Sequence, residues 1–190
     1  MAETTNTNLR QANAKALGEG IVSEIDLKEV VEEGKKKVTG SVTIKTGDTN
    51  FLRYNVNVNE KTKDGAENKT YAGIQTVMNE YKSIATVGEE EADKVRVGGD
   101  LNIYTGQNGV VVGYKSNFFN RVKNLDEFEP KAEFTVEVFI SSIAPEVNTD
   151  GEETGRVVVN GWVPTYNGIE PVKLYAEGDV AAAVESMFEP

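Results

Sequence analysis

Cationic and amide side chains alternate with apolar ones in two neighbouring stretches of the sequence, residues 37–45 and 51–57. Successive side chains of an extended strand point to opposite faces, so each stretch has one polar face. The polar side chains of the two stretches, together with one aromatic ring, include no carboxylate; they are Lys37, Thr39, Ser41, Thr43, Lys45, Phe51, Arg53, Asn55 and Asn57. Such a set suits a groove that follows a phosphate backbone and stacks a base on the ring. The pattern predicts a surface for single-stranded nucleic acid, and the alternative is an ordinary solvated strand face.

Charge is distributed unevenly along the chain. The protein has 20 Lys and Arg against 31 Asp and Glu, a formal net charge of −11, which on average disfavours a phosphate ligand. Residues 35–63 nevertheless hold seven Lys or Arg against two acids, a local balance of +5. Acidic residues collect elsewhere, at 89–91, 126–129 and 150–153. A basic segment inside an acidic protein favours the binding interpretation.

Histidine and cysteine are both absent. Their absence excludes disulfides, thiol chemistry, histidine general bases and the usual zinc ligands. A carboxylate enzyme is the third-ranked alternative, and we expect no enzymatic activity and no cofactor or metal. No segment approaches the ~20 apolar residues of a membrane helix, and the N-terminus does not resemble a secretory signal. Together with the lack of cysteine, these features predict a cytoplasmic protein without a membrane partner.

Hydrophobic periodicity predicts a mainly β fold with one helix in the first half of the chain. The expected elements, in order, are strands near 21–27, 37–45 and 51–59, a helix at 72–86, and strands near 95–103 and 110–122. An OB-fold is a five-stranded Greek-key barrel, and its helix lies between strands three and four. The predicted order of elements matches that fold.

The second half of the sequence resembles the first half. Residues 159–163, Val-Asn-Gly-Trp-Val, align with residues 38–42, Val-Thr-Gly-Ser-Val, and in both copies a second glycine follows seven residues after the first. Ile140 to Ile143 align with Val22 to Ile25, residues 171–175 align with Phe51 onward, and a helix is expected at 180–188. The alignment predicts a tandem OB-fold, with a flexible arm at 1–14, a first OB-type domain at 15–123, a linker at 124–131 and a second OB-type domain at 132–190. The second copy ends after its helix, so we expect a truncated, incomplete unit.

Strand alternation places further candidate residues outward. Trp162, the single tryptophan, aligns with Ser41 and is either a base-stacking platform or a half-buried packing residue. Tyr104 and Tyr114 flank the loop between the fourth and fifth strands. The predicted DNA-binding residues are Lys37, Lys45, Phe51, Arg53, Asn55, Tyr104, Tyr114, Arg156, Trp162, Lys173 and Tyr175.

Four short segments resemble a known family. They are Asn-Glu-Tyr-Lys-Ser-Ile-Ala at 79–85, Ala-Asp-Lys-Val-Arg-Val at 92–97, Asn-Phe-Phe-Asn-Arg-Val-Lys at 117–123 and Gly-Glu-Glu-Thr-Gly-Arg at 151–156. These phrases resemble the single-stranded DNA-binding proteins of tailed phages that infect Gram-positive bacteria, from about residue 14 to the end. The resemblance implies coating of exposed strands during phage DNA replication and recombination in the host cytoplasm. It also implies a longer family protein, and it suggests no reaction and no cofactor.

The predicted partners are single-stranded DNA and replication or recombination proteins. Oligomeric state, including a homo-oligomer, is left open by the sequence. The alternative function is a phage structural component, such as a decoration or tail protein, since an acidic tandem β repeat suits that role equally well.

Overall fold

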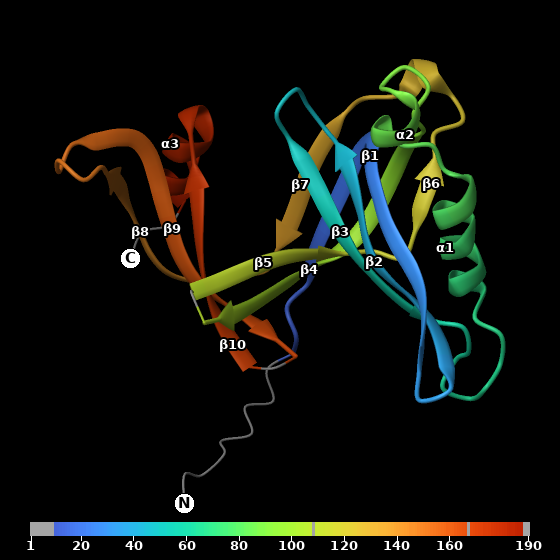
Figure 1. The fold of residues 1–190 in the computed structure, drawn as a ribbon. Helices are drawn as coiled ribbons and strands as arrows, with labels where there is room; N and C mark the ends of the chain where they lie inside the picture. Colours follow the sequence, from blue (N-terminus) through green and yellow to red (C-terminus); the bar gives the residue numbers. More distant parts are fainter. Residues whose placement is uncertain (1–9, 108, 167, 188–190) are drawn as a thin grey trace, which may run out of the picture. The chain divides into compact units, whose positions relative to one another are not determined.

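The fold is predominantly β, as predicted (Figure 1). The computed structural model describes residues 10–107, 109–166 and 168–187. Its elements in chain order are β1 (Ala14–Glu32), β2 (Lys35–Lys45), β3 (Phe51–Asn59), α1 (Lys69–Glu80), α2 (Ile84–Val87), β4 (Lys94–Gly106), β5 (Gly109–Lys115), β6 (Phe119–Arg121), the 3-10 helix η1 (Leu125–Glu127), β7 (Lys131–Val136), β8 (Phe139–Val147), β9 (Glu153–Thr165), β10 (Gly168–Ala176) and α3 (Gly178–Met187).

These elements form two compact units. The barrel unit comprises residues 14–102 and 112–135, and the C-terminal unit comprises residues 10–13, 103–111 and 136–187. The predicted boundaries at 15–123 and 132–190 differ from this division in two places. The end of the β4–β5 hairpin belongs to the C-terminal unit, whereas residues 124–135 belong to the barrel unit because β7 pairs with β1. Neither the grouping of the β4–β5 hairpin end with the C-terminal unit nor the pairing of β7 with β1 can be recognised from local sequence patterns.

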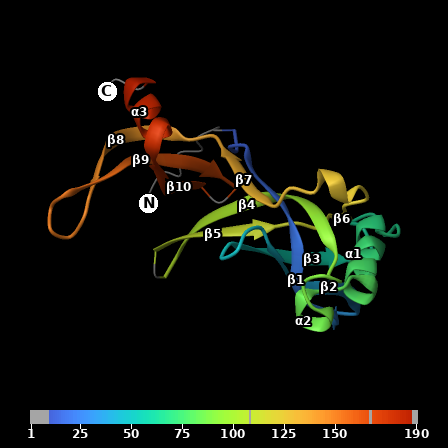
Figure 2. The same cartoon turned by 90° about the horizontal axis from the view of Figure 1, so that it is seen from above.

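Five strands of the barrel unit close on themselves. The sheet order is β6-β4-β5-β3-β2-β1-β7, and an additional pairing of β4 with β1 closes the ring β1-β2-β3-β5-β4. Strands β3 and β5 run parallel, whereas β1, β2 and β3 form an antiparallel meander. The interior is mainly aliphatic, and the aromatic ring of Tyr54 is fully buried in it. Helix α1 lies beside the barrel strands (Figure 2), and its residues Tyr71, Ile74 and Val77 belong to the same buried cluster.

Strand β1 is longer than predicted. It extends beyond the predicted strand near 21–27 as far as Glu32, and residues 29–32 pair with the start of β2. The ion pairs Lys36–Glu29 (3.6 Å) and Lys37–Glu32 (2.6 Å) bridge the two strands and compensate for their low apolar content. At the other end, residues 1–9 of the predicted flexible arm lie outside the described residues. Arg10 is held by two hydrogen bonds to Glu137 in the C-terminal unit.

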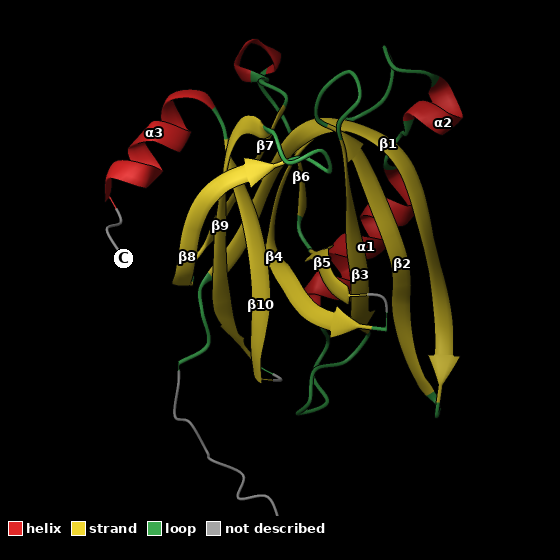
Figure 3. Cartoon of the chain, turned by 90° about the vertical axis from the view of Figure 1, so that its left-hand side faces the viewer, coloured by secondary structure: helices red, strands yellow, loops and turns green. Residues whose placement is uncertain are grey.

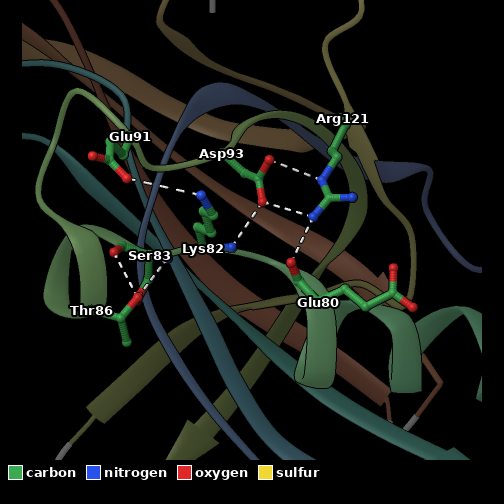
Figure 4. A network of polar contacts seen from close by, with 7 residues as sticks. All are labelled: Glu80, Lys82, Ser83, Thr86, Glu91, Asp93 and Arg121. Carbon is green, nitrogen blue, oxygen red and sulfur yellow. Dashed lines mark hydrogen bonds and ion pairs between the residues drawn. The ribbon is translucent and has the colours of Figure 1, made fainter.

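The predicted helix at 72–86 is two helices, α1 and α2, because polar contacts end α1 at Glu80 (Figure 4). Arg121 donates to the carbonyl oxygen of Glu80 (2.8 Å), and the backbone N–H of Lys82 donates to Asp93 (2.8 Å). Arg121 and Asp93 are themselves paired (2.9 Å). These contacts come from residues after the helix, so the apolar periodicity alone could not reveal the break.

The C-terminal unit contains a three-stranded antiparallel sheet, β10-β9-β8, followed by α3 (Figure 3). This repeats the order of β1, β2, β3 and α1. Gly40 and Gly161 hold equivalent places: a Cβ at Gly40 would collide with the carbonyl oxygen of Asp26, and one at Gly161 with the side chain of Val138. The predicted alignment of the first strand is shifted. Ile140 lies opposite Gly161, and the residue that lies opposite Gly40 in the first copy is Leu27 rather than Val22.

The core of the C-terminal unit is small. Val157 of β9, Ala176 of β10 and Ala181 of α3 form its buried cluster, with Ile143 and Val184 packed against it. The described part of the predicted second barrel is therefore an open sheet covered by a helix. Phe188, the predicted helix end, lies outside the described residues.

Candidate nucleic-acid interface

The predicted polar residues of β2 and β3 share one outward face. Antiparallel pairing sets Ser41 opposite Asn55, Thr43 opposite Arg53 and Lys45 opposite Phe51. The residues between them, such as Val42 and Tyr54, are fully buried in the barrel. We call this surface the β2–β3 face; it consists of Lys37, Thr39, Ser41, Thr43, Lys45, Phe51, Arg53, Asn55 and Asn57.

Two of its lysines are already paired. Lys37 lies 2.6 Å from Glu32, and Lys45 lies 2.8 Å from Glu89. Their side chains keep only 19% and 21% of their full exposure, so little of either remains open to a ligand. Glu32 and Glu89 lie outside the two strands, and for this reason strand alternation did not associate them with the lysines. The part of the prediction that rested on Lys37 and Lys45 is correspondingly weaker.

Arg53 and Phe51 are more open. The Nε of Arg53 donates to Ser41 Oγ (3.0 Å), which orients the guanidinium across the sheet. No carboxylate of the described residues lies within 4.0 Å of that guanidinium, and its terminal nitrogens have no hydrogen-bond partner there. Phe51, two residues earlier on the same face, is 51% exposed. A guanidinium without a carboxylate partner in the described residues and an exposed aromatic ring therefore lie along one strand.

Strand β5 adds a cation that the sequence reasoning missed. Asn55 pairs with Lys115 in the parallel β3–β5 ladder, so the two side chains point to the same outer face. Lys115 is exposed, and within the described part of the chain it has no ion-pair partner. Tyr114 points the other way and packs against Tyr54, with ring centroids 5.8 Å apart. The Tyr114 ring is therefore partly buried against the core and does not share the outer face with Lys115, which argues against its predicted contact with DNA.

Strand β1 brings acids to the opposite border of the face. Glu24 pairs with Thr43 and Asp26 with Ser41, and both acids are exposed. The outward face of β2 and β3 has no carboxylate, as we inferred from the sequence, but the adjacent strand β1 contributes two. The surface open to an anion is consequently the strip over β3 and β5 that carries Arg53, Asn55 and Lys115.

A second basic feature lies where β3 ends. A pocket of about 440 Å³ opens between the β1–β2 turn and the loop that follows β3. Four lysines and one glutamate contribute to its wall: Lys35, Lys36, Lys61, Lys63 and Glu60. The loop is ordered by the hydrogen bond from Thr62 N–H to the carbonyl oxygen of Ala66 (2.9 Å). Four of the seven cations in the basic segment 35–63 thus gather at the end of β3.

The predicted residues of β9 and β10 in the C-terminal unit also share a face. Lys173 pairs with Asn160 and Tyr175 with Val158, while Val157 and Ala176 point to the opposite, helix-covered side. Trp162 lies on the same face as Lys173 and Tyr175 and is 47% exposed. Directly opposite Trp162 on β8 is Phe139, 59% exposed, which the sequence reasoning missed because a bulge after Ile140 interrupts the alternation.

Arg156 and Tyr175 are engaged with each other. The guanidinium of Arg156 lies 5.0 Å from the centroid of the Tyr175 ring, and Lys173 Nζ lies 5.4 Å from that centroid. Arg156 also donates two hydrogen bonds to Glu146 (2.6 and 2.8 Å), and these hold the pKa of Glu146 below its ordinary value of 4.5. The Tyr175 ring thus already makes cation–π contacts with Arg156 and Lys173. Trp162 and Phe139 are the rings of this face that remain accessible to a ligand. Tyr104 belongs to this unit rather than to the unit that contains Tyr114.

A family model described as YorF matches residues 13–190 of the chain. The chain belongs to the YorF family. No curated protein matches it.

Two further observations concern the described residues of this YorF-family chain. No group of three Asp or Glu side chains gathers there as a metal site would require. No helix there is both long enough and apolar enough to span a membrane.

Proposed function

We propose that this protein binds single-stranded DNA along β3 and β5 of the barrel unit. The observation that carries the proposal is the strip of Arg53, Asn55 and Lys115, in which both cations are exposed and neither has a carboxylate partner within the described residues. Phosphate contacts by Lys and Arg supply the sequence-independent part of nucleic-acid affinity. The carboxamide of Asn55 offers a donor to phosphate oxygens between the two cations.

An exposed ring on the same strand favours a single strand over a duplex. Bases of single strands stack on aromatic side chains, whereas bases in a duplex are stacked on one another. Phe51 lies on the strip's own strand, and its 51% exposure leaves a face for such a base. The acids Glu24 and Asp26 border the other side of the face and repel phosphates, so a strand is favoured over β3 rather than β1.

The fold class proposed for the barrel unit is an OB-type barrel. Its support is the closed strand order β1-β2-β3-β5-β4, with α1 between β3 and β4 in the chain. OB-folds bind oligonucleotides on strands two and three and the neighbouring loops. The strip over β3 and the lysine pocket after β3 both fall within that region. Coating of phage DNA, together with replication or recombination proteins, remains the proposed biological setting.

The test is a titration of fluorescein-labelled oligo(dT) with the purified protein, compared with a duplex of the same length. We expect binding to the single strand at low salt and a loss of affinity of two or more orders of magnitude toward about 0.5 M salt. Ultraviolet cross-linking of the complex should modify the β3 peptide that contains Phe51. Absence of binding at every salt concentration would refute the proposal and favour a phage structural role.

A further inference from the structure

A separate pocket of about 620 Å³ lies on the outer surface of the barrel unit. Residues from the start of β1, the middle of β4, the end of β5 with the segment after it, and the later part of β7 line it. Two exposed phenylalanines contribute to the lining, Phe118 (63% exposed) and Phe134 (58% exposed). A pocket that carries two exposed aromatic rings suits a flat aromatic ligand.

Gly98 of β4 leaves part of this pocket free of side chains. It is exposed, and a Cβ built on it would meet no atom within 4 Å. A flat ring can therefore approach the backbone at Gly98. The position has no positive φ and no close neighbour, so the fold itself does not require glycine there.

Charge in the pocket is largely compensated. Lys15 is ion-paired with Asp100, and Glu133 lies 3.3 Å from Lys131. Lys115 is the exception: it lines the pocket and, within the described chain, has no carboxylate partner. Lys115 also flanks Asn55 on β3, so the pocket is continuous with the strip that we propose binds DNA.

We infer that this pocket holds one nucleobase of the bound strand, whose phosphate lies on Lys115. The inference rests on the proposed function and adds a base-binding subsite outside the β2–β3 face. Two exposed apolar rings and an open stretch of backbone at Gly98 suit a flat base rather than a phosphate. A base in the pocket would fix the strand next to Lys115 without adding to the number of phosphate contacts.

The test compares Gly98→Leu, which fills the pocket without a change of charge, with Gly73→Leu, which places the same side chain at an equally open glycine on α1. Oligo(dT) affinity is measured at several salt concentrations, and thermal unfolding checks the fold. We expect Gly98→Leu to weaken binding about tenfold, within the range of one stacked base, and to leave the salt slope unchanged. Gly73→Leu should bind as the wild type does. Phe118→Ala should reproduce the loss seen with Gly98→Leu.

The outcomes separate the two proposals. If the wild type binds oligo(dT) and neither Gly98→Leu nor Phe118→Ala weakens that binding, the base pocket is overturned and the proposed function stands. A wild-type protein that binds no oligo(dT) overturns both. A reduced salt slope in Gly98→Leu would overturn the pocket as a base site, because it would mean that phosphate contacts were lost.

Discussion

The two units of the chain begin with the same order of three strands and a helix, and they bury very different amounts of side chain. In the barrel unit, β4 pairs with β1, and the closed ring encloses fully buried residues such as Tyr54 and Ile74. In the C-terminal unit the three-stranded sheet stays open, and its buried cluster consists of Val157, Ala176 and Ala181. The difference shows that the shared pattern specifies a curved three-stranded sheet, whereas closure depends on later strands.

Equivalent positions of the two sheets also carry different chemistry. Ser41 and Trp162 both follow the shared glycine, and both lie on the sheet face opposite the helix-covered side. In the barrel unit the serine holds Arg53, and the open groups are cationic and amide. In the C-terminal unit the tryptophan lies opposite Phe139, and the nearest cations are held against Tyr175. One backbone pattern thus supports a strip of cationic and amide side chains in one unit and an aromatic face in the other.

The largest expected effect concerns the shared glycine itself. Gly40→Ala should lower the free energy of unfolding by about 4 kcal/mol, because its φ of 138° is strained for alanine and the new Cβ collides with β1. Gly161→Ala should cost about 2 kcal/mol, since only the collision applies there. Chemical denaturation followed by circular dichroism measures both. A larger loss for Gly161→Ala would refute the comparison of the two backbones.

A smaller effect is expected on the aromatic face of the C-terminal unit. Because the sequence predicts Trp162 as a base-stacking platform and its ring is exposed, Trp162→Ala should weaken oligo(dT) binding about tenfold, the contribution of one stacked base. Tyr175→Ala is the matched control, and it should have little effect on binding because Arg156 and Lys173 already lie against its ring. Fluorescence anisotropy measures both variants. If Tyr175→Ala proves the more damaging, the assignment of the open ring is wrong.

The smallest expected effect is on acid stability. A hydrogen bond from Arg96 lowers the pKa of Glu19 below its ordinary value of 4.5, and the Glu19 carboxylate is almost fully buried between β1 and β4. The stability that this carboxylate contributes is present above about pH 4.5 and is lost as the pH falls through its lowered pKa. Glu19→Gln should reduce the pH dependence of unfolding in that window by less than about 1.4 kcal/mol per pH unit.

The control for this prediction is Glu24→Gln, an exposed carboxylate of the same strand that makes no ion pair within the described residues. Unfolding free energies measured between about pH 3 and 6 should show an unchanged slope for this variant. An equal change of slope in both variants would mean that the Glu19–Arg96 contact is not the cause.

Local sequence patterns predicted the strands well but could not predict their long-range partners. The alternation of β2 and β3 correctly placed Arg53 and Phe51 outside and Tyr54 inside, because that alternation depends only on the pleat. Lys115 was missed, and the packing of Tyr114 against the core was not foreseen, because the parallel β3–β5 pairing joins segments about 60 residues apart. The covering of Lys45 by Glu89 was equally invisible, since it depends on where the loop after α2 lies.

The same limit applies to the domain boundaries. Composition identified 124–131 as a linker, but Glu19 and Arg96 hold that segment through the backbone N–H of Glu129 and the carbonyl oxygen of Glu127. The repeat was visible because Gly40 and Gly161 face the same close approach of a neighbouring strand. Steric requirements of this kind leave a trace in the sequence, whereas the partner of an exposed cation does not.

The most direct test of the account is a comparison of two double charge reversals in oligo(dT) binding at low salt. Arg53→Glu with Lys115→Glu changes the strip over β3 and β5, and Lys69→Glu with Lys123→Glu makes the same change of charge at exposed lysines outside it. We predict that the first variant binds at least about 100-fold more weakly and shows a smaller salt slope, while the second stays within a few-fold of the wild type. Equal losses in the two variants would mean that net charge alone governs binding, and would contradict a site on the β3–β5 strip.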